Sequence, residues 1–135
     1  MEELKFTLAL KADSMKAVNL PERVAWQVNQ VKSKLVYDYS HYAAFGLDMR
    51  QTMELVVPYT VFVHIKDTLG RSPTQRFVLP GDGPVDFNAY KKNLIELGYR
   101  GPVVVEVSTH VFNQPGYDPV KAAEHVWEKV SPVFA

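Results

Sequence analysis

The stretch from Tyr59 to Ile65, Tyr-Thr-Val-Phe-Val-His-Ile, predicts a β-strand because β-branched and aromatic residues predominate in it. After a long connection, Asp86 is placed to cap a helix whose apolar residues recur at helical spacing. These apolar residues are Phe87, Tyr90, Leu94 and Leu97. Gly98 follows them and is a typical helix stop. The segment from Tyr59 to Gly98 is therefore predicted to be one strand-helix unit.

The same alternation continues on both sides of this unit. Further strands are predicted at Leu4–Leu10, Leu35–Tyr37 and Val103–Val105. The matching helices are expected after the cap residues Asn19, Asp48 and Asp118. Strict alternation of short apolar strands with helices is typical of a parallel sheet with right-handed crossovers. The chain is therefore predicted to be a single α/β domain over residues 1–135, in the order βαβαβαβα.

Composition narrows the possible functions. A chain of 135 residues with 47% hydrophobic and 22% charged residues fits a single globular domain with a core. Fifteen Lys and Arg residues balance fifteen Asp and Glu residues, which argues against nucleic acid or a membrane surface as a partner. The absence of cysteine leaves His, Asp and Glu as the plausible metal ligands. No apolar run approaches the roughly 20 residues of a membrane span, and no secretory leader is visible, so a cytoplasmic protein is expected.

An ionisable residue stands at or next to the end of each predicted strand. These residues are Lys11, Asp38, His64 and Glu106. In a parallel barrel the carboxyl ends of the strands converge on one mouth, where barrel enzymes carry their chemistry. A histidine with two carboxylates is a suitable ligand set for Mn²⁺, Mg²⁺ or Zn²⁺. The strand ends therefore predict a polar site with room for a divalent metal.

Four short motifs occur in order along the chain, three of them at these strand ends. They are Val36-Tyr37-Asp38-Tyr39-Ser40-His41, Val63-His64-Ile65-Lys66-Asp67, Pro80-Gly81-Asp82-Gly83-Pro84-Val85-Asp86 and Gly98-Tyr99-Arg100-Gly101-Pro102-Val103-Val104-Val105-Glu106. Together they resemble the fifth to eighth strand-helix units of the xylose isomerase-like barrel superfamily. That superfamily includes sugar isomerases, keto-sugar epimerases, inosose dehydratases and endonuclease IV-type repair enzymes. The resemblance implies a (βα)4 half of a TIM barrel, with four parallel strands that are each followed by a helix.

The resemblance also implies roles for individual residues. The metal ligands would be Asp38, His64 and Glu106. Glu106 would in addition be the catalytic residue that moves a proton. The substrate would be held by His41, Lys66 and Asp67. The implied chemistry is isomerisation or epimerisation of a small sugar, with the metal polarising a carbonyl and a hydroxyl.

Lys11 departs from the family pattern, because the fifth strand of the family normally ends in a glutamate that is a fourth metal ligand. A lysine there would repel the metal or pair with Asp38 or Glu106, so the metal site is expected to be weakened. Simpler interpretations of the other residues stay open. Instead of binding metal, Asp38 would cap the turn after its strand, Glu106 would form a salt bridge with Lys11 or Lys66, and His64 would be a hydrogen-bonded histidine of the core.

The first four units of the family barrel are absent from the chain. Half a barrel would leave its inner face open to solvent, including Thr7, Ala9, Val36, Thr60 and Phe62. It would also leave two unpaired strand edges. Two copies related by a two-fold axis would close eight strands, so a homodimer is expected, with a complementary half-barrel as the other possible partner.

Two functions follow from these expectations. The first is a homodimerising half-barrel that keeps a relic or weakened metal and sugar site. The second is an active divalent-metal-dependent sugar isomerase or epimerase whose site is assembled in the dimer. The long connection from Asp67 to Gly83 is expected to be a lid or a surface insertion. A nuclease would need extra zinc ligands in this connection, and it contains no histidine. On the helices, Trp26 and Trp127 are expected to pack against the sheet.

Overall fold

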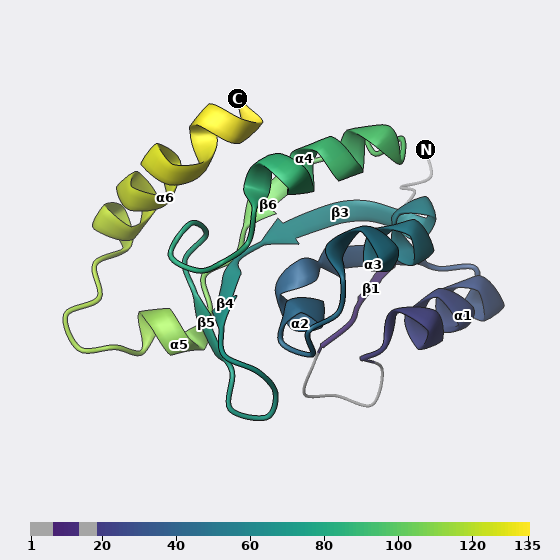
Figure 1. The fold of residues 1–135 in the computed structure, drawn as a ribbon, viewed down its shortest axis with the longest axis horizontal. Helices are drawn as coiled ribbons and strands as arrows, with labels where there is room; N and C mark the ends of the chain where they lie inside the picture. The colour runs from purple at the N-terminus through teal and green to yellow at the C-terminus, as the bar shows by residue number, and fades with distance from the viewer. Residues whose placement is uncertain (1–6, 14–18) are drawn as a thin grey trace, which may run out of the picture.

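The computed structural model describes residues 7–13 and 19–135, and a four-stranded sheet forms its centre (Figure 1). In spatial order the strands are β1 (Ala9–Lys11), β2 (Lys34–Asp38), β3 (Thr60–Ile65) and β6 (Val103–Val105). All three pairings are parallel, and Asp38 lies beside His64 in the register of β2 and β3. The predicted α/β class with four parallel strands is therefore confirmed.

A long helix lies between each of these strands and the next, and another follows the last. The helices are α1 (Pro21–Val31), α3 (Met49–Val56), α4 (Phe87–Glu96) and α6 (Pro119–Phe134). Asp48, Asp86 and Asp118 cap α3, α4 and α6 by accepting backbone N–H bonds, as predicted. The expected cap at Asn19 is wrong, because α1 begins after Leu20 without a side-chain cap. Within the described residues, none of the helices is long and apolar enough to cross a membrane.

The elements that the sequence did not reveal are all short. They are α2 (Tyr39–Ala43), the 3-10 helix η1 (Val57–Tyr59), β4 (Asp67–Leu69), β5 (Arg76–Val78) and α5 (Thr109–Phe112). The strands β4 and β5 pair antiparallel, so the long connection after β3 contains a hairpin. The first strand, expected at Leu4–Leu10, spans Ala9–Lys11, while residues 1–6 lie outside the described part of the chain.

The main core lies between the sheet and the helices. Leu35, Tyr37, Val63 and Ile65 are buried there, together with apolar residues of α1, α3, α4 and α6. The ring of Tyr37 stacks against Tyr42, with ring centroids 5.8 Å apart. The two tryptophans are not part of this core, contrary to expectation: Trp26 is 67% exposed and Trp127 is 69% exposed. Helical spacing identifies a buried face only when the neighbouring element is present to cover it.

In the part of the chain that the structure describes, the opposite face of the sheet has no helix on it. Ala9, Val36 and Phe62 are half-buried there and line a shallow hollow of about 700 Å³. Within the described residues, β1 pairs only with β2, and β6 pairs only with β3. Residues 7–13 and 19–135 therefore show the open inner face and the two free edges expected for half a barrel.

Candidate functional site

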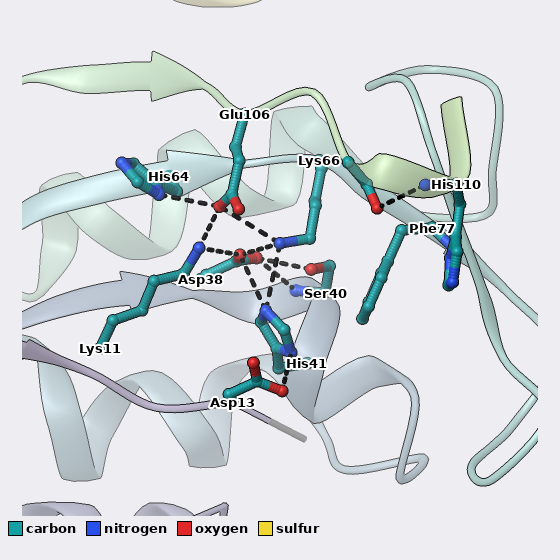
Figure 2. Close-up of polar contacts among 11 residues, drawn as sticks. Lys11, Asp13, Asp38, Ser40, His41, His64, Lys66, Phe77, Glu106 and His110 are labelled. Atoms are coloured by element: carbon teal, nitrogen blue, oxygen red, sulfur yellow. Dashed lines mark hydrogen bonds and ion pairs between the residues drawn. The ribbon is translucent and has the colours of Figure 1, made fainter. Parts of the chain in front are cut away.

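Side chains from four strand ends meet in one cluster at the carboxyl edge of the sheet (Figure 2). The cluster consists of Lys11, Asp38, His41, His64, Lys66 and Glu106. Parallel pairing brings these residues together, because the register aligns Asp38 with His64 and places Glu106 beside Ile65. The predicted convergence of the strand ends is thus found in the structure.

Asp38 is buried and uses its two oxygens for different partners. Its Oδ1 accepts bonds from the backbone N and the Oγ of Ser40, at 3.1 and 2.6 Å, and so caps α2. Its Oδ2 lies 2.6 Å from Lys66 Nζ, 3.3 Å from His41 Nε2 and 3.4 Å from Lys11 Nζ. Burial alone would raise the pKa of Asp38, but the hydrogen bond from His41 and the charge of Lys66 outweigh it and hold this pKa well below its usual range. Asp38 is therefore an ionised carboxylate at neutral pH.

One oxygen of Glu106 contacts three nitrogen-bearing side chains. Its Oε2 contacts Lys11 Nζ and lies 2.9 Å from His64 Nδ1 and 3.2 Å from Lys66 Nζ. Partial burial acts to raise the pKa of Glu106, whereas the bond from Lys11 and the charge of Lys66 lower it further than burial raises it. Glu106 is therefore also ionised, and both carboxylates are occupied by cationic side chains. Glu106 therefore forms salt bridges with lysines, as one interpretation predicted, and also belongs to the polar cluster.

Lys66 is the innermost cation of the cluster. Its ammonium is buried, lies over the ring of Phe77 at 4.7 Å from the centroid, and is 3.1 Å from His41 Nε2. With Asp38 and Glu106 also in contact, this charge is fully compensated by carboxylates and an aromatic face. Lys66 faces the mouth, although its side chain is almost closed off from solvent.

His41, which the resemblance assigns to substrate binding, lies in α2 and is buried. Its Nε2 faces Asp38, and its Nδ1 lies 3.7 Å from Oδ1 of Asp13. Its ring also packs against Phe77, with centroids 4.9 Å apart. His41 is therefore held between two carboxylates beneath the mouth.

Asp67 differs from the prediction that placed it in a substrate site. It is fully buried, and its two oxygens accept four backbone N–H bonds at 3.0 to 3.3 Å. The donors belong to Thr68, Gly81, Gly83 and Val85. Burial raises the pKa of Asp67, while these four bonds act in the opposite direction. Adjacent residues of an extended strand point to opposite sides, so Asp67 leaves the mouth where Lys66 enters it and instead holds the following loop.

A half-open hollow of about 500 Å³ lies above the cluster. Lys11, Lys66 and Glu106 line its floor. Its wall comes from the segment that contains α5, including Ser108, His110 and Phe112. His110 was not singled out from the sequence, yet its Nδ1 accepts the backbone N–H of Phe77 at 3.0 Å and its ring stacks on Phe77. No local pattern marks such a residue, because its position depends on the hairpin packing against α5.

Residues 18–129 match the protein family described as the xylose isomerase-like TIM barrel. The chain belongs to this family. Among curated relatives, a putative L-ribulose-5-phosphate 3-epimerase, SgbU of Escherichia coli K12, is 33% identical over 89 residues, which cover 63% of this chain and 31% of the relative. The L-ribulose-5-phosphate 3-epimerase UlaE of Escherichia coli is 28% identical over 102 residues, which cover 76% of this chain and 35% of that enzyme. The chain thus spans about a third of the length of these relatives.

Solved structures show the same fold over about twice the length. The IolI protein, solved with a binding zinc atom, has a TM-score of 0.74 at 24% identity and is similar over 96% of this chain and 50% of its own. The 3-keto-D-glucoside 4-epimerase YcjR of Escherichia coli has a TM-score of 0.68 at 17% identity, over 95% of this chain and 45% of its own. The four strand-helix units of this chain therefore correspond to half of a TIM barrel, as predicted.

The site of this xylose isomerase-like chain does not fit a divalent metal as it stands. Within the described residues, no group of three or more His, Asp and Glu side chains is arranged to hold a metal ion. Asp38, His64 and Glu106, the predicted ligands, do meet, but the ammonium groups of Lys11 and Lys66 contact their oxygens. The expected pairing of Lys11 is therefore found with both carboxylates.

Proposed function

We propose that this chain is one half of a sugar isomerase- or epimerase-type barrel, that it pairs with a second copy of itself, and that its mouth is a relic of a metal and sugar site. The observation that carries the proposal is the open inner face of the sheet between two free edges. Parallel sheets are normally covered on both faces, and free edges invite pairing with another chain. A second half-barrel would cover the open face and pair both free edges.

The geometry of the edges suits a two-fold assembly. In such an assembly β1 of one copy would pair with β6 of the other, and the parallel order would continue around eight strands. The backbone ladder beside β1 already extends to Leu8, whose carbonyl accepts the N–H of Lys34 at 3.1 Å. Two copies of the polar cluster would then share one mouth.

Apolar side chains beside each edge support the same arrangement. A cleft of about 590 Å³ lies between β6 and α6 and is lined by Val103, Val105, Val126 and Trp127. At the other edge, Leu8 is 75% exposed and, by strand alternation, points to the same side as Leu10, which packs against the core. Pairing of β1 with β6 would bring Leu8 of one copy to the apolar cleft of the other and remove both surfaces from water.

The chemistry of the mouth supports a polyhydroxylated ligand. Carboxylates and ammonium groups at the floor of a half-open hollow offer hydrogen-bond acceptors and donors to sugar hydroxyls. The named relatives are sugar epimerases, which is consistent with a small sugar as the ligand. Because the carboxylates are already paired with lysines, we propose that the site is weakened in comparison with a metal-loaded one.

Light scattering over a concentration series of the 135-residue chain tests the assembly. We expect a mass of twice 15.3 kDa that falls toward the monomer on dilution. Leu8→Asp should shift the equilibrium toward the monomer, because it places a charge in the apolar contact. Leu55→Asp is the matched control, since Leu55 is an exposed apolar residue on α3, away from both edges. A compact monomer at all concentrations would contradict self-pairing and favour a complementary half-barrel as the partner.

The active-enzyme alternative is tested separately. A panel of keto-sugars and keto-sugar phosphates is incubated with the chain, with and without Mn²⁺, and isomeric products are quantified. We expect no turnover above background. Epimerisation by the wild-type chain that is lost in Glu106→Gln would contradict the relic site and establish a catalytic one.

A further inference from the structure

The ammonium of Lys11 lies against two carboxylates, and one of these also contacts an imidazole. Its Nζ contacts Oε2 of Glu106 and lies 3.4 Å from Oδ2 of Asp38. The same Oε2 lies 2.9 Å from Nδ1 of His64. Two carboxylates and an imidazole are donors that Mn²⁺ and Zn²⁺ accept in proteins. The protein thus places one of its own cations against the two carboxylates that such an ion would need.

The charge balance of the cluster is already complete. The ammonium groups of Lys11 and Lys66 balance the carboxylates of Asp38 and Glu106, so the four side chains together carry no net charge. A divalent ion added to this set would leave it with two uncompensated positive charges in a partly buried place, which is unfavourable.

The two lysines are not equivalent in this respect. Lys66 is buried against Phe77 and enclosed by its partners. The side chain of Lys11 is 29% exposed and reaches the cluster from the edge strand β1. Replacing Lys11 therefore changes the charge of the cluster and leaves the buried lysine, Lys66, in place.

We infer that Lys11 is a built-in cation that replaces a divalent metal and excludes it from this site, so that this one residue decides whether the mouth binds metal. A carboxylate at position 11 would add a ligand, remove one positive charge and leave an excess of two negative charges that a divalent ion neutralises. All of these residues belong to one chain, so the inference does not depend on the proposed assembly.

The test is a titration of the full chain with MnCl₂ and ZnCl₂, followed by isothermal calorimetry and by the shift of the melting temperature. The wild-type chain should show no saturable binding at the cluster. Lys11→Glu should bind Mn²⁺ at least about tenfold more tightly than the wild type, and adding His64→Ala to it should reverse the gain. Lys121→Glu is the matched control, because it makes the same charge change at an exposed position on α6 and should leave metal binding unchanged.

A second variant covers the possibility that Lys11→Glu does not fold. Lys11→Gln removes the ammonium without adding a carboxylate and should bind Mn²⁺ more tightly than the wild type but less tightly than Lys11→Glu. A folded Lys11→Glu chain with no gain would overturn the inference, and so would Lys11→Gln with wild-type binding. Saturable metal binding by the wild-type chain that disappears in His64→Ala would overturn it as well.

Discussion

Asp38 performs two tasks with one carboxylate. One oxygen caps α2 through Ser40, and the other faces the buried ammonium of Lys66. The sequence suggested both a capped turn and a site residue, and the structure shows that these two interpretations are compatible. A carboxylate has enough lone pairs to cap a helix and pair with a cation at the same time.

Asp38→Asn should destabilise the fold by about 3–5 kcal/mol at pH 7, because it leaves the buried charge of Lys66 without its closest partner. The pKa of Asp38 is lowered in the folded state, so its contribution is present above the unfolded pKa of about 3.9 and is lost as the pH falls below that value. Urea denaturation between pH 3 and pH 7 should therefore show that the free energy of unfolding of the variant falls less with decreasing pH than that of the wild type.

Asp118→Asn provides the control for Asp38→Asn. Asp118 caps α6 at the surface, where asparagine caps a helix about as well as aspartate. The free energy of unfolding of Asp118→Asn, and its decrease at acidic pH, should stay close to those of the wild type. Equal stability of Asp38→Asn and Asp118→Asn at pH 7 would show that the Lys66 pair does not stabilise the fold.

Among the elements, the main helices and strands were predictable and the short ones were not. Cap residues and apolar spacing act within a few residues, so Asp48, Asp86 and Asp118 identified their helices. The hairpin of β4 and β5 packs against a distant part of the chain, whereas α2 and α5 have local caps at Asp38 and Ser108 but are too short to show apolar spacing. Phe77 of β5, for example, is held by His110 of α5.

The loop after the hairpin depends on Asp67, and its replacement should affect that element more than the sheet. Asp67→Asn substitutes an NH₂ group for an oxygen that faces backbone N–H donors, which should cost about 1–3 kcal/mol. Amide exchange of Gly81, Gly83 and Val85 should accelerate. Asp48→Asn, where asparagine still caps α3, should change stability by only a few tenths of a kcal/mol. Unchanged exchange at Gly81 and Gly83 would contradict this role of Asp67.

For the whole molecule, pairing of two half-barrels predicts a melting temperature that depends on concentration. Mass action favours the dimer by about 1.4 kcal/mol for each tenfold increase in concentration, which corresponds to roughly 2–4 °C for a protein of this size. Calorimetry at increasing concentrations should show this rise for the wild type and for Leu55→Asp, and a smaller one for Leu8→Asp. A melting temperature independent of concentration in the wild type would contradict the assembly.

The sequence by itself determined the order of strands and helices, the aspartate caps and the set of polar residues at the strand ends. These features follow from periodicity and from hydrogen bonds between near neighbours, which a linear pattern records. Only the tertiary structure decided which charges neutralise each other, because Lys11 and Glu106 are 95 residues apart and meet only when β1 and β6 lie in one curved sheet. It also decided that Asp67 turns away from the mouth and that Trp26 and Trp127 remain exposed, since burial depends on what lies opposite a residue in space.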